Sequence, residues 1–196
     1  DAPVMNAAAR LTHADVVLME STYGDRLHRP IAETMEELTE VFQTARAAQG
    51  NILIPAFTVG RTQDLLHLMV ENYDRWNLDK WDIFLDSPMA IEASEIYWNY
   101  PQLYDAEATR LRRRLNEMPI LGNLHFSGSV QESQAINRIH SGAIVIAGSG
   151  MCSGGRIKQH LKHNIWRHNC HVIISGFQAQ GTLGRALVDG AKFIRL

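Results

Sequence analysis

The chain has 196 residues, of which 45% are apolar, and its 19 basic and 21 acidic residues give a net charge of −2 at neutral pH. This composition is typical of soluble globular proteins and excludes disordered, collagen-like and coiled-coil chains. The length predicts a single domain over residues 1–196, and no apolar run approaches the ~18 residues that a membrane-spanning helix needs, so we expect no membrane partner.

Five short apolar runs predict the strands of a buried sheet. They are rich in β-branched residues and do not alternate with polar ones, which is typical of a parallel sheet covered on both faces. The runs are residues 16–19, 52–57, 83–85, 143–147 and 171–175.

Amphipathic segments separate these runs and predict helices. In the first of them, apolar side chains recur every three or four positions, and glutamates crowd its first half on the opposite face. The predicted helices are residues 32–49, 62–73, 90–98, 106–115, 131–140, 155–166 and 182–188. Strands alternating with helices predict an α/β fold with a mostly parallel, Rossmann-like sheet flanked by helices.

Ligands of open α/β sheets bind beyond the carboxyl ends of the strands, so the residues after each run are candidates for function. Glu20, Ser21, Thr22, Tyr23 and Gly24 follow the first run. A carboxylate and two hydroxyls there suit contacts with a polar ligand or a catalytic partner. The alternative is a turn whose hydroxyls cap backbone donors.

Two further strand ends carry glycine and arginine. After the second run, Gly60 permits a tight turn and Arg61 opens a helix, where an anion can bind; a salt-bridged surface arginine is the alternative. After the fifth run, residues 175–185 combine an aromatic side chain, two amides and an arginine. There Gly181 and Thr182 can start a helix, and the set suits either nucleotide contacts or helix capping.

The most unusual stretch is residues 148–155, with four glycines and two serines in eight residues. Such a backbone can bring several N–H groups close to a phosphate; a loop needed only for packing is the alternative. No Gly-Lys-Ser/Thr follows, so it is not a Walker A motif. Its glycine spacing also differs from the dinucleotide fingerprint, which argues against a nucleotide-binding Rossmann-like enzyme.

Potential zinc ligands cluster near the C-terminus. His160, His163, His168, Cys170 and His171 lie within twelve residues, but no Asp or Glu accompanies them in the sequence. We expect partly buried histidines and a core cysteine rather than a metal site.

The two cysteines are too few for a disulfide framework, which favours a reducing, cytoplasmic setting. Cys152 lacks any signature that would supply a catalytic base, so we do not expect it to be a nucleophile.

Charge is distributed unevenly along the chain. Residues 1–155 hold 12 basic and 20 acidic side chains, whereas residues 156–196 hold 7 basic and one acidic. A basic C-terminal segment is compatible with a polyanion on one face. Four arginines within residues 110–114 form a second basic run, which a solvated helix face also explains.

Taken together and in this order, five stretches resemble the β-CASP domain of RNA-processing metallo-β-lactamase nucleases, the bacterial and archaeal relatives of the cleavage-and-polyadenylation endonuclease. The stretches are Val17-Leu-Met-Glu-Ser-Thr-Tyr-Gly24, Ile54-Pro-Ala-Phe-Thr-Val-Gly-Arg-Thr-Gln63, Leu85-Asp-Ser-Pro-Met-Ala90, Gly148-Ser-Gly-Met-Cys-Ser-Gly-Gly-Arg156 and Ser175-Gly-Phe-Gln-Ala-Gln-Gly-Thr-Leu-Gly-Arg185.

The resemblance implies that this domain clamps RNA against a metallo-β-lactamase domain, in which two zinc ions activate the attacking water. Glu20 matches an acid of the family that orients a later histidine near the leaving group, and it is the catalytic candidate. Residues at the cleft or facing phosphates by the same analogy are Ser21, Thr22, Tyr23, Arg61, Ser149, Ser153 and Gly154.

Comparison with the family's motifs also identifies those that this sequence does not contain. The zinc-binding His-x-His-x-Asp-His motif is absent, as are the family's later histidine motifs. We therefore expect a domain excised from a longer nuclease, with no metal site of its own and no cleavage of RNA by itself. Expected partners are RNA or single-stranded DNA and the missing metallo-β-lactamase domain, and a homodimer is open. The alternative function is a non-catalytic α/β module that binds nucleic acid or protein.

Overall fold

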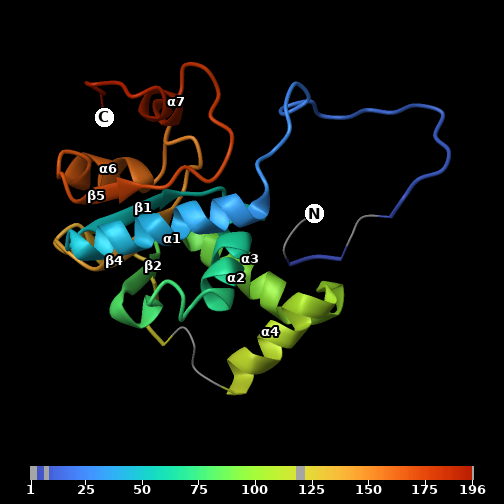
Figure 1. Ribbon diagram of the computed structural model, residues 1–196, viewed down its shortest axis with the longest axis horizontal. Helices are drawn as coiled ribbons and strands as arrows, with labels where there is room; N and C mark the ends of the chain where they lie inside the picture. Colours follow the sequence, from blue (N-terminus) through green and yellow to red (C-terminus); the bar gives the residue numbers. More distant parts are fainter. Residues whose placement is uncertain (1–3, 7–8, 118–121, 196) are drawn as a thin grey trace.

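The computed structural model describes residues 4–6, 9–117 and 122–195. In this part of the chain, five strands form one parallel sheet in the order β3-β2-β4-β1-β5 (Figure 1). The strands are β1 (Asn51–Pro55), β2 (Asp82–Leu85), β3 (Leu124–Phe126), β4 (Ala143–Ala147) and β5 (Cys170–Val172). The predicted α/β fold with a parallel sheet is confirmed.

The seven predicted helices are also confirmed, each within four residues at either end. They are α1 (Ile31–Ala47), α2 (Arg61–Glu71), α3 (Pro88–Asn99), α4 (Ala106–Glu117), α5 (Val130–Ile136), α6 (Ile157–Asn164) and α7 (Leu183–Val188), with 3₁₀ turns η1 (Leu78–Lys80) and η2 (Pro101–Leu103). Hydroxyl caps begin three of them, because Ser87, Ser129 and Thr182 accept backbone hydrogen bonds at the starts of α3, α5 and α7. None of the helices described is long and apolar enough to cross a membrane.

Both faces of the sheet are covered, which explains why its strands are continuously apolar. Ile52 and Ile54 of β1 belong to a core that contains side chains of α1 and α2, including Phe42 and Met69. Leu53, on the opposite face, belongs to a second core with side chains of α5 and α6. The molecule is therefore a three-layer α/β/α structure (Figure 1).

The central strand, β4, and its neighbour β1 are hydrogen-bonded to each other. The helix that follows β1 is α2, which packs in the first core, and the helix that follows β4 is α6, which packs in the second. The chain thus leaves the carboxyl ends of these two strands toward opposite faces. This divergence is the geometry that opens a ligand crevice in α/β sheets.

Three sequence predictions need correction. The predicted buried strand at residues 16–19 is wrong: the segment has no regular structure and Leu18 is 95% exposed. A strand requires a partner for its backbone hydrogen bonds, and no described segment pairs with this one. Sequence reasoning missed β3, a three-residue edge strand, and the predicted strand at residues 171–175 is shorter, at Cys170–Val172.

Candidate nucleic-acid interface

Three loops meet at the carboxyl edge of the sheet. The loop after β1 contacts the glycine-rich loop after β4, since an added Cβ on Gly150 would lie 2.6 Å from the ring of Phe57. The loop after β5 joins them, because the Gln178 side-chain amide donates to the Gly150 carbonyl at 2.9 Å. The motifs around residues 57, 150 and 178 therefore form one continuous surface at the crevice.

Gln178 and Gly184 fix α7 against the glycine-rich loop. Gln178 is buried, and an added Cβ on Gly184 would lie 1.6 Å from its Oε1. The Gly184 N–H donates to the Met151 carbonyl at 3.0 Å. Thr182 caps α7, as predicted, and Arg185 one turn in forms an ion pair with Asp189. These contacts give the last motif a structural role beside any contact with a ligand.

The glycine-rich loop folds back on itself through Ser149 and Gly154. The Ser149 N–H donates to the Gly154 carbonyl at 3.3 Å, and the Gly154 N–H donates to the Ser149 hydroxyl at 3.2 Å. Gly155 has a φ of +68° and an added Cβ there would lie 2.2 Å from the Gly148 carbonyl oxygen, so only glycine suits that position.

The tip of this loop is open. Ser153 is exposed, and an added Cβ on Gly154 would meet nothing within 4 Å. The N–H groups of Met151 and Ser153 make no hydrogen bond within the described part of the protein. Free backbone donors on an open turn are suited to an anion.

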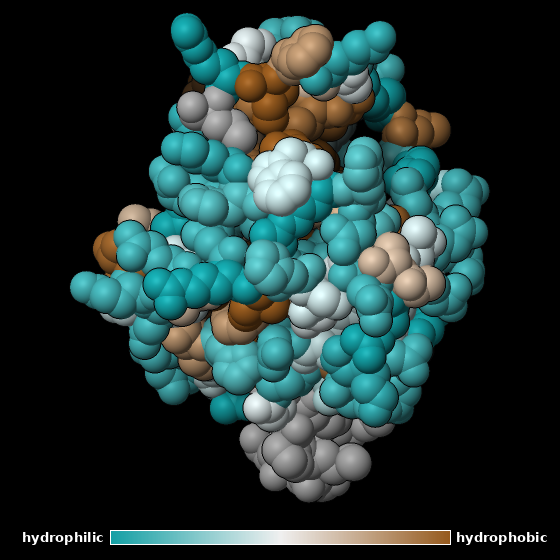
Figure 2. Space-filling model, turned by 90° about the vertical axis from the view of Figure 1, so that its left-hand side faces the viewer, coloured by the Kyte–Doolittle hydropathy of each residue, from teal (hydrophilic) through white to brown (hydrophobic). Residues whose placement is uncertain are grey.

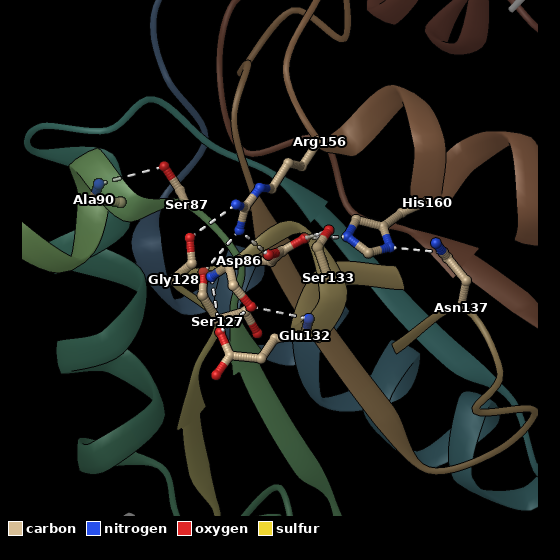
Figure 3. A network of polar contacts seen from close by, with 11 residues as sticks. Asp86, Ser87, Ala90, Ser127, Gly128, Glu132, Ser133, Asn137, Arg156 and His160 are labelled. Carbon is tan, nitrogen blue, oxygen red and sulfur yellow. Dashed lines mark hydrogen bonds and ion pairs between the residues drawn. The ribbon is translucent and has the colours of Figure 1, made fainter. Parts of the chain in front are cut away.

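A buried polar network holds the end of the glycine-rich loop in place (Figure 3). Asp86, which follows β2, is fully buried, and its carboxylate lies 2.7 Å from Nη1 of Arg156 and 2.5 Å from Nε2 of His160. The Ser133 hydroxyl donates to the same carboxylate at 2.6 Å. Three elements, α5, α6 and the end of β2, are thus joined at one side chain.

The network keeps the Asp86 carboxylate ionised. Burial alone would raise the pKa of Asp86, but hydrogen bonds from His160, Ser133 and Arg156 outweigh it and hold the pKa below its ordinary value. Arg156 also donates to the carbonyls of Ser127 and Gly128, at 2.7 and 3.0 Å, in the loop after β3. This side chain therefore ties that loop to the end of the glycine-rich loop.

Arg61 begins α2 on the other side of the crevice. Its side chain is 46% exposed and lies 3.6 Å from the Asp64 carboxylate. The salt bridge that was the alternative to an anion site at Arg61 is therefore present. The guanidinium remains accessible to a ligand. Gln63 holds the turn in place, because its Oε1 accepts from the Gly60 N–H at 2.7 Å and its Nε2 donates to the Thr58 carbonyl.

The segment that carries Glu20 lies outside the layered body (Figure 1). Glu20, Ser21 and Thr22 are exposed, and the Glu20 carboxylate accepts from the Thr22 N–H at 2.7 Å. Hydrogen bonds from the Thr22 side chain and backbone lower the pKa of Glu20. Of this segment, the structure brings Tyr23 to the loop after β5, where its ring lies nearly perpendicular to that of Phe177, with the ring centroids 5.8 Å apart.

The cluster of histidines and cysteine does not converge. His160 is buried against Asp86, whereas His163 and His168 are exposed. Among the residues that the structure describes, no group of three or more His, Cys, Asp or Glu side chains is arranged to hold a metal ion. Burial raises the pKa of Cys152 and of Cys170 to about 11, which makes both thiols poor nucleophiles.

Sequence reasoning treated His160 only as a potential zinc ligand that was expected to be partly buried, and it assigned no role to Asp86, Ser133 or Arg156. The available signal was Asp86-Ser87-Pro88 directly after a predicted strand, since an acid at that place needs a partner when buried. The partner could not be identified, because His160 lies 74 positions away.

Comparison with known proteins agrees with this architecture. A family model described as the Beta-Casp domain matches residues 62–187. The chain is 36% identical over 93% of its length to "Ribonuclease TTHA0252" of Thermus thermophilus. It is 33% identical over 96% to "Transcription termination factor FttA" of Pyrococcus abyssi and 32% identical over 98% to an "RNase J-like protein" of Methanocaldococcus jannaschii.

The chain spans less than half the length of each of these relatives, with 42%, 29% and 44% covered respectively. The family model covers most of the chain, including the loops after β4 and β5, and it begins at Thr62, just after the loop that follows β1. The resemblance found in the five sequence stretches is confirmed, and the chain belongs to the Beta-Casp domain family.

Proposed function

We propose that this chain is the RNA-clamping domain of a zinc-dependent metallo-β-lactamase-type ribonuclease. The observation that carries the proposal is the joining of three loops at the β1–β4 crevice, in a fold whose relatives include a named ribonuclease. Crevices at such strand ends bind ligands in α/β folds generally, and the open backbone donors of the glycine-rich loop suit phosphates.

In this proposal the site residues divide by chemistry. Arg61 meets a phosphate through its accessible guanidinium, and Ser149, Ser153 and Gly154 meet another through the glycine-rich loop. Tyr23, beside Phe177, offers an aromatic ring to a base. Every group named here recognises features that single-stranded RNA and DNA share, so the nucleic acid must be identified by experiment.

Glu20, Ser21 and Thr22 act in catalysis or substrate binding only when this domain is joined to the rest of the protein. The residues before it are apolar and exposed: Val16 and Val17 are 78% and 75% exposed, and Leu18 and Met19 more so. Apolar side chains in a row are stable against another surface rather than in water. We assign that surface to the metallo-β-lactamase domain, which would also bring Glu20 to the reaction centre.

The zinc ions belong to that other domain. The described residues of this chain do not fit a metal site, since no suitable cluster of ligands is found among them. The domain's contribution is accordingly to bind and orient the strand. The two free cysteines support a reducing, cytoplasmic setting.

Cleavage assays on the full-length protein test this function. Labelled single-stranded RNA and DNA of one sequence are incubated with wild-type protein, with Glu20→Gln and with the control Glu33→Gln, which alters an exposed acid of α1. We expect RNA cleavage to fall by about 10²–10⁴ in Glu20→Gln, with RNA binding retained and the control unaffected. Wild-type protein that binds RNA without cleaving it would instead support the non-catalytic module. Preferential cleavage of DNA would identify DNA as the substrate.

A further inference from the structure

We propose that the nucleic acid does not end at the crevice but continues over α5 and α6 to Trp166, along a track for single-stranded polynucleotide. This inference rests on the proposed function and extends it to a second surface. The track has two parts, a groove between the helices and an aromatic platform beyond the end of α6.

The first part is a hollow of about 430 Å³ between α5 and α6. It begins at Arg156, which the buried Asp86 carboxylate and two backbone carbonyls hold in place. Its lining side chains include hydrogen-bond donors and positively charged groups, and none of them is acidic. The polar residues that matter are Gln134, Asn137, Arg138, Arg156, Gln159 and His163.

Two of these side chains have an accessible polar group. Arg138 is exposed and forms no ion pair with any described residue. His163 donates from Nδ1 to the Gln159 carbonyl at 2.8 Å, because a carbonyl can only accept, so Nε2 of the neutral ring is an open acceptor, suited to a sugar hydroxyl or a base N–H rather than to a phosphate. The groove therefore combines the fixed guanidinium of Arg156 with the accessible one of Arg138, as backbone-tracking surfaces do.

The second part is built around Trp166, whose side chain is exposed (70%). The Arg167 guanidinium lies 5.3 Å from the centre of its ring, and Arg167 also donates to the Ile139 carbonyl at 3.4 Å. His140 and His168 line the same hollow, again without an acid. An indole with a cation anchored against it presents a stacking surface for a base.

The two parts are joined by α6 itself. The helix begins just after Arg156 and ends two residues before Trp166, so its eight residues separate them by about 12 Å. That is the length of about three to four stacked nucleotides at ~3.4 Å each. Trp166 lies at the edge where the strands begin, a face that is mostly hydrophilic (Figure 2) and so better suited to nucleic acid than to an apolar partner.

Charge favours this side of the sheet over the other. The segment from residue 156 onward holds 7 of the basic residues and a single acid. By contrast, α1 covers the opposite face and carries four glutamates within residues 33–40. A strand leaving the crevice toward α1 would meet like charge, whereas one leaving toward α6 meets opposite charge.

Binding of two oligouridylates tests the track. A 4-mer and a 12-mer are titrated into the full-length protein in the presence of EDTA, which stops metal-dependent cleavage. The variants are Trp166→Ala, Trp166→Phe and Arg138→Ala, with Arg75→Ala as control because Arg75 pairs with Glu36 of α1 on the other face. Both Trp166 and Arg138 are exposed, so the substitutions should leave the fold intact.

We expect Trp166→Ala to weaken binding of the 12-mer about tenfold, Trp166→Phe to restore most of it, and the 4-mer to bind all variants as it binds the wild type. Arg138→Ala should lower the slope of log affinity against log salt by about 0.7 for the 12-mer alone, and Arg75→Ala should not. Indole fluorescence should be quenched by the 12-mer, and that quenching should be lost in Trp166→Phe.

Equal affinity of wild type and Trp166→Ala for the 12-mer, with the 4-mer still bound, would overturn the track and leave the proposed function standing. The same follows if Trp166 emits as a buried indole before RNA is added, since another part of the protein then covers it. Failure of the wild type to bind either oligonucleotide would contradict the proposed function itself, and the track with it.

Discussion

Asp86 and His160 form a fully buried pair in which the carboxylate Oδ2 and the imidazole Nε2 are 2.5 Å apart. The pair connects the end of β2 to α6, and Arg156 and Ser133 complete it. Since a buried carboxylate is stable only when its hydrogen bonds are made, this pair fixes the base of the glycine-rich loop. The crevice thus depends on residues that do not face a ligand.

Removal of the Asp86 charge should destabilise the whole domain. Asp86→Asn removes the charge and replaces one acceptor oxygen with an NH2 donor, so Arg156 or His160 loses its acceptor, and breaking a buried ion pair costs about 3–5 kcal/mol. Urea unfolding measures the loss. Asp82→Asn is the matched control, because Asp82 is another acid of the same strand region but lies exposed beside His125 at 3.3 Å; it should change stability by less than ~0.5 kcal/mol. Similar effects of the two substitutions would contradict the account.

The same carboxylate predicts a loss of stability in acid. The pKa of Asp86 is lower in the folded protein than the ~3.9 of an unfolded aspartate, so the unfolded chain takes up the proton first as pH falls. The stabilisation is complete above pH ~4 and is lost as pH drops through the folded-state pKa. Urea unfolding at pH 7, 4 and 3 should therefore show a steeper decline for wild type than for Asp86→Asn. Parallel declines would exclude Asp86 as the source.

Two neighbouring glycines should respond differently to substitution by alanine. Gly155→Ala places a Cβ 2.2 Å from the Gly148 carbonyl oxygen at a φ of +68°, which should cost at least about 1–3 kcal/mol and several degrees of melting temperature. Gly154→Ala puts its Cβ in open space and should melt within about 1 °C of wild type. Thermal unfolding of both variants checks this, and equal melting temperatures would refute the loop geometry.

Arg61 should contribute to RNA affinity through charge alone. Its exposed guanidinium, released from Asp64 or shared with it, neutralises one phosphate in the proposed complex. In Arg61→Ala, the slope of log affinity against log salt for single-stranded RNA should fall by about 0.7 to 1. Arg75→Ala removes an equal charge away from the crevice and should leave the slope unchanged. An unaltered slope in Arg61→Ala would remove Arg61 from the site.

The sheet and its helices could be predicted from the sequence because the signals are local. Ile52, Leu53 and Ile54 are continuously apolar since both faces of β1 are covered, and the predicted Thr182 cap begins α7 as expected. The same rule misassigned residues 16–19. Their apolar run indicates burial, but the surface that would bury them is not among the described elements, so the segment lies exposed.

Contacts between residues far apart in the sequence could not be predicted from local sequence patterns. Nothing near Asp86 in the sequence reveals that His160 and Arg156, about 70 positions later, share its carboxylate. Phe57 and Gly150 likewise meet only because β1 and β4 are adjacent, an order that the chain does not reveal by periodicity. The candidate residues could be found one loop at a time, whereas their assembly into one crevice required the strand order.

Photocrosslinking of single-stranded RNA that carries 4-thiouridine tests the central claim most directly. The full-length protein is irradiated with bound RNA and the modified peptides are identified by mass spectrometry. The account predicts crosslinks in the loops after β1, β4 and β5, around residues 57–61, 149–154 and 177–181. Crosslinks confined to α1 and the face of the sheet that it covers, with none in these three loops, would contradict it.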